Sequence, residues 1–186
     1  PVSPETVENF CRQFGQYGFK RETMMPVYGL AECSVGLALP PLDRGPLIDK
    51  IDRDTFVNTG HAVPSSGADD RVLRFVACGH PLPRHEVRIV DNAGRELPDR
   101  YEGNLHFRGP SATGGYYHNE EDTKKLFAGE WLDSGDMAYI ADGDIYITGR
   151  KKDIIIRAGR NIYPQELEEA VGKVAGIRKG NVVVFA

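Results

Sequence analysis

Residues 131–153 decide how this chain folds, and they read WLDSGDMAYIADGDIYITGRKKD. The apolar runs Ala138–Ile140 and Asp144–Thr148 are separated by the turn Ala141-Asp142-Gly143-Asp144. Short apolar runs bounded by turns containing aspartate and glycine are typical of β-strands. The segments Ser134-Gly135-Asp136 and Gly149-Arg150-Lys151-Lys152-Asp153 flank these runs. Each of them on its own is as typical of a turn as of a binding site.

The same pattern of short strands extends outward through the middle of the chain. Strands are expected at Val72–Cys78, Glu86–Val90 and Gly103–Phe107. A helix is expected after Asn119, because asparagine is a good N-cap and three acidic residues follow it at the positive end of the helix. Residues 40–70 are rich in Pro, Gly, Asp and Ser with little periodicity, so we expect a long excursion with weak structure of its own.

The two ends of the chain show clearer periodicity. Apolar residues at helical spacing predict a helix over residues 4–17 that ends at Gly15 or Gly18. The remaining expected elements are a buried strand at Met24–Tyr28, a strand at Asp153–Arg157, a helix that begins at Pro164, and a last strand at Asn181–Phe185. Because that last strand stops at the terminus with no closing element, we expect the chain to be cut inside a larger fold. Its open edge also predicts some self-association.

Composition excludes several classes of protein. The 186 residues carry 23 basic and 27 acidic side chains, and this net charge of −4 argues against binding to nucleic acid. There is no apolar run long enough for a membrane span and no secretory signal, so a cytoplasmic location is expected. Three widely spaced cysteines match neither a disulfide framework nor a metal cluster. Glycine is enriched, with 21 residues that punctuate the apolar runs, which is typical of tight turns or of backbone close to a ligand.

The common catalytic fingerprints are missing. The sequence contains no P-loop motif, no dinucleotide-binding glycine motif and no serine-hydrolase nucleophile elbow. The five histidines show no metal-binding spacing and are best interpreted as surface or packing residues. Glu32, taken alone after the segment that ends at Tyr28, is more typical of a solvated loop carboxylate than of a site.

The order of the glycine-rich segments is more specific than any one of them. The segments are Tyr28-Gly29-Leu30-Ala31-Glu32, Glu102-Gly103-Asn104-Leu105 followed by Gly114-Gly115-Tyr116, Trp131–Asp136, Gly149–Ile155, and Gly159–Glu168. This succession resembles the adenylate-forming superfamily, which includes acyl-CoA synthetases, fatty acyl-AMP ligases, luciferases and the adenylation domains of peptide synthetases. The resemblance covers about residues 24–168.

The resemblance implies a role for seven residues. Tyr28 and Gly29 lie where such enzymes contact adenine, and Glu32 matches the catalytic carboxylate that helps to hold Mg²⁺ on the phosphates of ATP. Asp136 matches the carboxylate that accepts the ribose hydroxyls, and Arg150 lies where a second ribose or phosphate contact is made. Lys152 aligns with the hinge about which the small C-terminal domain turns between two half-reactions, and is therefore the second catalytic candidate. Gly159 falls on the loop that approaches the pantetheine arm.

The resemblance also implies a fold and a boundary. We expect a mixed α/β fold, β-rich in the middle, in which residues 1–151 form the late part of the large adenylation domain with a distorted β-barrel-like subdomain. Residues 152–186 would then begin the small α+β C-terminal domain. Two departures are notable. Ala31 stands where many relatives have a threonine, and the family's phosphate loop and catalytic lysine would lie outside this sequence.

The implied activity is that of an ATP-dependent fatty acyl-activating ligase. Such an enzyme uses ATP and Mg²⁺ to convert a fatty or other carboxylic acid to acyl-AMP, and then transfers the acyl group to CoA or to the phosphopantetheine of an acyl carrier protein. Gly79 lies 47 positions after Glu32, and fatty acyl-AMP ligases carry an extra segment in this region, whereas the segment Gly149–Glu168 is more similar to the CoA-ligase pattern. We therefore expect a fatty acyl-activating enzyme near the boundary of these two groups. We expect these 186 residues alone to be inactive. The alternative is a non-catalytic, β-rich nucleotide-binding or interaction module.

Overall fold

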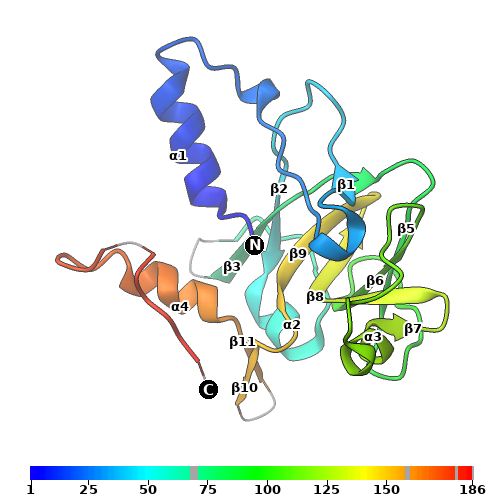
Figure 1. Cartoon of the computed structure of the whole chain (residues 1–186). Helices are drawn as coiled ribbons and strands as arrows, with labels where there is room; N and C mark the ends of the chain where they lie inside the picture. Colours follow the sequence, from blue (N-terminus) through cyan, green and yellow to red (C-terminus); the bar gives the residue numbers. More distant parts are fainter. Residues whose placement is uncertain (68–70, 158–159, 179, 186) are drawn as a thin grey trace.

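The computed structural model describes residues 1–67, 71–157, 160–178 and 180–185 (Figure 1). Its helices are α1 (Pro4–Gly15), α2 (Arg53–Thr59), α3 (Glu120–Leu126) and α4 (Pro164–Val171), with 3₁₀ turns at Arg21–Thr23 and Ala31–Cys33. Its strands are β1 (Ala38–Leu39), β2 (Ile48–Asp52), β3 (Val72–Val76), β4 (His80–Pro81), β5 (Glu86–Val90), β6 (Gly103–Arg108), β7 (Phe127–Ala128), β8 (Trp131–Ala141), β9 (Asp144–Arg150), β10 (Ile155–Arg157) and β11 (Arg160–Ile162).

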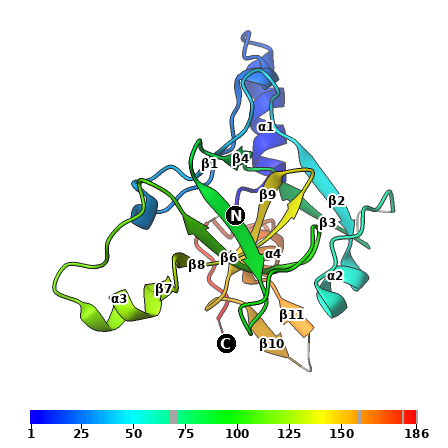
Figure 2. The same cartoon turned by 90° about the vertical axis from the view of Figure 1, so that its right-hand side faces the viewer.

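The centre of the molecule is an antiparallel sheet of five strands. Its order is β5-β6-β8-β7, with β9 paired to β8. Its register shifts between Asn104 and His106 and again between Met137 and Ala138, and such bulges bend and twist a sheet locally. The strands therefore curl instead of lying flat, as Figure 2 shows. The expected mixed α/β fold that is β-rich in the middle is confirmed.

Two apolar clusters form the core. The first covers one face of the central sheet, with Leu105, Phe107 and Leu132 almost fully buried. The second is aromatic, and its rings come from α2, β8, β9 and the segment before α4. In it, Tyr139 stacks on Tyr146 with ring centroids 4.9 Å apart. Aromatic side chains bury large areas, so the packing in this cluster stabilises the contacts between elements that are distant in the sequence.

Most of the expected elements are present. The first helix ends at Gly15, its Ser3 hydroxyl accepts a hydrogen bond from the Thr6 N–H, and β5 has the expected bounds. The helix after Asn119 is capped by that residue, whose amide oxygen accepts a hydrogen bond from the Asp122 N–H at 3.1 Å. The apolar run at Ala138–Ile140 belongs to a much longer strand, β8, because the polar residues before it also pair with β6 and β9.

Three expectations about local structure are wrong. Met24–Tyr28 is not a strand. Tyr28 makes a single bridge to Ala38, and Pro26 has no N–H to donate to a ladder. Asn181–Phe185 is not a strand either, because the backbone N–H of Val184 donates instead to the carboxylate of Glu168 at 2.9 Å. The self-association expected of this segment stays a prediction.

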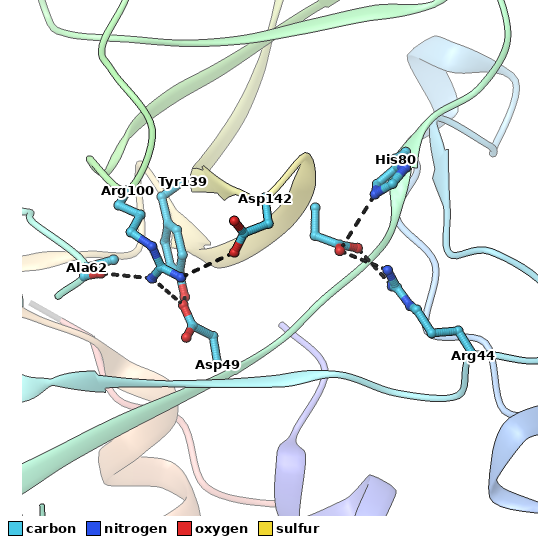
Figure 3. A network of polar contacts seen from close by, with 8 residues as sticks. Arg44, Asp49, Ala62, His80, Arg100, Tyr139 and Asp142 are labelled. Atoms are coloured by element: carbon cyan, nitrogen blue, oxygen red, sulfur yellow. Dashed lines mark hydrogen bonds and ion pairs between the residues drawn. The ribbon is translucent and has the colours of Figure 1, made fainter. Parts of the chain in front are cut away.

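The third wrong expectation concerns residues 40–70, which contain β2 and α2. Asp52 caps α2 by accepting a hydrogen bond from the Thr55 N–H at 2.8 Å, and Phe56 is fully buried in the aromatic cluster. Figure 3 shows the polar contacts that anchor the segment. Asp49 accepts hydrogen bonds from Arg100 and from the Tyr139 hydroxyl, at 3.0 and 2.9 Å. Periodicity missed this structure because its elements are short and are held by distant partners.

Candidate nucleotide-binding site

The Asp136 carboxylate lies between two side chains from distant parts of the chain. The hydroxyl of Tyr28 donates a hydrogen bond to Oδ2 of Asp136 at 2.6 Å. On the other side, Nε of Arg150 lies 3.6 Å from Oδ1, because Asp136 on β8 and Arg150 on β9 are direct register partners. The Asp136 side chain is 13% exposed, whereas that of Arg150 is 62% exposed. The structure thus brings together three of the predicted site residues.

Burial keeps the phenol of Tyr28 in its neutral form. Tyr28 is 8% exposed, and its burial, together with the neighbouring Asp136 carboxylate, raises the pKa of its phenol far above the ordinary value. Tyr28 therefore remains a hydrogen-bond donor at physiological pH. A carboxylate has more acceptor positions than the Tyr28 hydroxyl occupies, so Asp136 can accept hydrogen bonds from a bound hydroxyl group as well.

A local distortion of β8 aims the Asp136 side chain. The hydroxyl of Ser134 donates to the Leu105 carbonyl at 2.7 Å and accepts from the backbone N–H of Asp136 at 3.1 Å. Gly135 has a φ of +73°, which a glycine adopts without strain, and its carbonyl accepts from the Lys151 N–H at 3.0 Å. The Ser134-Gly135-Asp136 segment is thus both a turn-like distortion and part of the candidate site.

Glu32 lies four residues after Tyr28, on a tight loop that begins at Gly29. Gly29 is required there because a Cβ at this position would lie 1.6 Å from the Val35 carbonyl oxygen. Ser34 and Val35 have φ values of 49° and 77°, and a β-branched residue with positive φ persists only where its surroundings hold it. The loop is therefore a strained, closely packed turn that carries a partly exposed carboxylate.

The carboxylate of Glu32 accepts a hydrogen bond from the hydroxyl of Tyr116 at 2.5 Å. This bond raises the pKa of the Tyr116 phenol to about 12. Among the residues that the structure describes, no three His, Cys, Asp or Glu side chains form a cage for a metal ion. Mg²⁺ bound with a nucleotide needs no such cage, since one or two carboxylates, phosphates and water complete its shell. The donor set here, a single accessible carboxylate, fits that mode of binding.

The last two predicted site residues lie after β9. Lys152 is exposed in the turn that leads to β10, and the N–H groups of Asp153 and Ile154 in that turn both donate to the Arg150 carbonyl. Gly159 lies outside the described residues. Beyond this turn the chain packs back on the earlier part, because Tyr163 is buried in the aromatic cluster against Phe56.

Sequence reasoning missed several contacts that surround these residues. Tyr116 ends the glycine-rich segment Gly114-Gly115-Tyr116, but nothing in that pattern indicates that it binds Glu32. Glu102 accepts hydrogen bonds from the hydroxyls of Thr148 and Tyr163, and Arg53 forms a bidentate pair with Glu166. These partners are 46 to 113 residues apart in the chain, so no local signal could have identified them. No helix in the described part of the chain has the length and apolarity that a membrane crossing needs.

Comparisons with known proteins show which family the chain is similar to. Residues 1–117 match the family model of AMP-binding enzymes. The chain is 35% identical, over 93% of its length, to a medium-chain fatty acid–acyl carrier protein ligase, JamA, of Moorena producens, and 32% identical, over its whole length, to the long-chain fatty acid–AMP ligase FadD32 of Mycolicibacterium smegmatis. It covers 31% and 32% of those two proteins.

A solved structure from a study of fatty acyl-adenylate ligases from E. coli and L. pneumophila superposes with a TM-score of 0.87 at 38% identity. The superposition covers 94% of this chain and 32% of that one. The fold is thus that of the adenylate-forming superfamily. The chain belongs to the family of AMP-binding enzymes, and it spans about a third of the length of the curated relatives that it matches.

Proposed function

We propose that this chain supplies part of the nucleotide-binding surface of an ATP-dependent fatty acyl-activating ligase. The reaction joins a fatty acid to ATP, which gives acyl-AMP and pyrophosphate, and then passes the acyl group to the thiol of CoA or of an acyl carrier protein. The observation that supports this most directly is the Asp136 carboxylate held between Tyr28 and Arg150. The names of JamA and FadD32 support a fatty acid as the substrate.

In this proposal each residue has a chemical task. Asp136 accepts the ribose hydroxyls, and hydrogen bonds to a charged acceptor are among the stronger ones in proteins. Arg150, with its exposed guanidinium, contacts the ribose or a phosphate. Tyr28 and Gly29 face the adenine, and the bond from Tyr28 to Asp136 ties the adenine and ribose positions together. Mg²⁺ neutralises phosphate charge when bound, and Glu32 is the residue that would hold it.

We further propose that the turn at Lys152 is a hinge and that residues 152–186 begin a second domain. Lys152 is exposed and joins β9 to β10 without packing in either core cluster. Gly159 would then approach the pantetheine arm of the acceptor. Because the chain spans about a third of its relatives, we expect these residues to act within a longer polypeptide and to be inactive alone.

The decisive experiment measures fatty acid-dependent ATP–pyrophosphate exchange in the complete reading frame that carries this chain. Asp136→Asn keeps the shape and an acceptor for Tyr28 but removes the charge. It should raise the KM for ATP by about ten-fold to a hundred-fold, the size expected for hydrogen bonds to a charged group. Asp136→Ala should reduce exchange further.

Asp99→Ala is the matched control, because Asp99 lies exposed in a turn between β5 and β6. Its exchange should equal that of the unmodified protein. Absence of exchange with every fatty acid tested would refute the proposed reaction. Unchanged exchange in both Asp136 variants would refute the ribose assignment alone.

A further inference from the structure

Ser111 stands at the centre of a polar cluster that no motif predicted. Its Oγ lies 2.7 Å from Nε2 of His85, 3.2 Å from Sγ of Cys33 and 3.3 Å from the Cys33 carbonyl oxygen. Cys33 is fully buried, and the Ser111 and His85 side chains are partly buried. The cluster joins the turn after β6 to the loop that carries Glu32. We call these contacts of His85, Ser111 and Cys33 the Ser111 brace.

With the His85 ring neutral, one arrangement of protons satisfies the contacts of Ser111 with His85 and with the Cys33 thiol, while the Cys33 carbonyl, 3.3 Å from Oγ, shares the Ser111 proton at longer range. Nδ1 of His85 lies 3.1 Å from the Pro83 carbonyl, and because a carbonyl can only accept, Nδ1 carries the proton. In the neutral ring Nε2 is then an acceptor, so the hydroxyl of Ser111 donates to it. The Ser111 oxygen in turn accepts from the thiol of Cys33. His85 thus orients the hydroxyl of Ser111, and Ser111 in turn holds the loop that contains Cys33 through its hydrogen bond with the Cys33 thiol.

The ring of His85 is held in place by its surroundings. A Cβ added to Gly109 would lie 2.2 Å from Cδ2 of His85 and 2.6 Å from its Cγ. The imidazole therefore rests directly against the backbone of Gly109, and a larger residue there would displace it. With its two nitrogens bonded and one face supported, His85 is a rigid part of the cluster and not a solvated surface side chain.

The brace lies next to Glu32 in both sequence and space. Two further bonds cross between the same two loops, from the Thr113 N–H to the Glu32 carbonyl at 2.8 Å and from the Ser34 hydroxyl to the Ser111 carbonyl at 3.1 Å. The loop needs such support, because Ser34 and Val35 have positive φ. Removing the central hydroxyl would leave only these two bonds, from Thr113 and Ser34, between the two loops.

We propose that His85 is a positioning residue which, through Ser111 and Cys33, fixes the loop that presents the Glu32 carboxylate. This proposal rests on the proposed function, in which Glu32 holds the Mg²⁺ of MgATP. Small displacements of a group that positions a substrate reduce rates strongly. The brace is therefore expected to affect the use of MgATP and not the use of the fatty acid.

The kinetic test uses the complete reading frame and the variants His85→Leu, Ser111→Ala and His85→Gln. The first two should lower kcat/KM for MgATP by about ten-fold while the KM for the fatty acid stays unchanged. His85→Gln should restore most of the loss, because its amide oxygen can accept from Ser111. His118→Asn, at an exposed histidine of the following loop, is the control and should behave as the unmodified protein.

A merely structural role would give a different result. Partial unfolding lowers kcat in proportion to the folded fraction, and therefore lowers kcat/KM for MgATP and for the fatty acid by the same factor. That pattern without rescue by His85→Gln would overturn the proposal. Unchanged kcat/KM for MgATP in His85→Leu and Ser111→Ala would overturn it too. Absence of exchange in the unmodified protein would instead refute the proposed function.

Amide hydrogen exchange tests the brace without any activity. Ser111→Ala should speed exchange of the Cys33, Val35 and Thr113 amides, all of which donate hydrogen bonds in these loops, by about ten-fold. Exchange in β5 should not change. Equal protection of the two loops in the variant and in the unmodified protein would show that the brace holds nothing, and would overturn the proposal whatever the enzyme does.

Discussion

Replacing Asp144 by alanine should be among the most destabilising single changes in this protein. The Asp144 side chain is 5% exposed, and both of its oxygens accept hydrogen bonds from Arg44 at 2.8 Å, while Nε2 of His80 lies 3.6 Å away. The alanine variant leaves the Arg44 guanidinium without this carboxylate partner. Breaking a buried ion pair in this way costs about 3–5 kcal/mol.

The structure places the expected cost at the lower end of that range. The Arg44 side chain is 22% exposed, so water can reach part of the abandoned guanidinium. We therefore expect Asp144→Ala to lose about 3 kcal/mol of unfolding free energy. The double variant Arg44→Met with Asp144→Ala removes both charges and should be more stable than Asp144→Ala alone. Together with the single variant Arg44→Met it completes a double-mutant cycle, in which we expect a coupling energy of about 2 kcal/mol.

Urea denaturation followed by tyrosine and tryptophan fluorescence measures these differences, with the m-value as a check on two-state behaviour. Asp142→Asn is the matched control, because Asp142 is 94% exposed and lies 3.7 Å from Arg100. It should change stability by less than about 0.5 kcal/mol. Equal losses in Asp144→Ala and Asp142→Asn, or a double variant less stable than either single one, would refute the reasoning.

Two further predictions concern the candidate site. The phenol of Tyr116 should titrate at a pKa of about 12 in a 295 nm absorbance titration and fall toward ~10 in Glu32→Gln, since the Glu32 carboxylate is the first cause of the raised pKa. Because folding raises this pKa, the contribution of the Tyr116–Glu32 bond to stability is complete below pH ~10 and is lost between pH ~10 and about 12. A Tyr116 pKa that stays at about 12 in Glu32→Gln would contradict this. Lys152→Pro, which restricts the turn after β9, should slow thioester formation more than adenylation, and equal losses in both steps would argue against a hinge at Lys152.

The turn after β8, the start of α3 and the end of α1 were predictable from the sequence, because each of them depends on neighbouring residues. The turn at Asp142-Gly143 and the cap at Asn119 use side chains within a few positions of the backbone that they serve. The same holds for the helix that ends at Gly15. Where the partner is distant, as for β2 and α2, periodicity within the segment carries too little information.

The sequence by itself determined the family resemblance, the strands around residues 131–150, and the choice of Tyr28, Asp136 and Arg150 as candidates. Only the tertiary structure decided that these three side chains meet, that Tyr116 binds Glu32, and that His85 is a structured partner of Ser111 instead of a surface histidine. The physical reason is the same in each case. Short motifs reflect the local conformation of the backbone. Hydrogen bonds and ion pairs, by contrast, join residues as far as 168 positions apart, as in the Lys173–Glu5 pair, and only the folding of the chain brings such residues together.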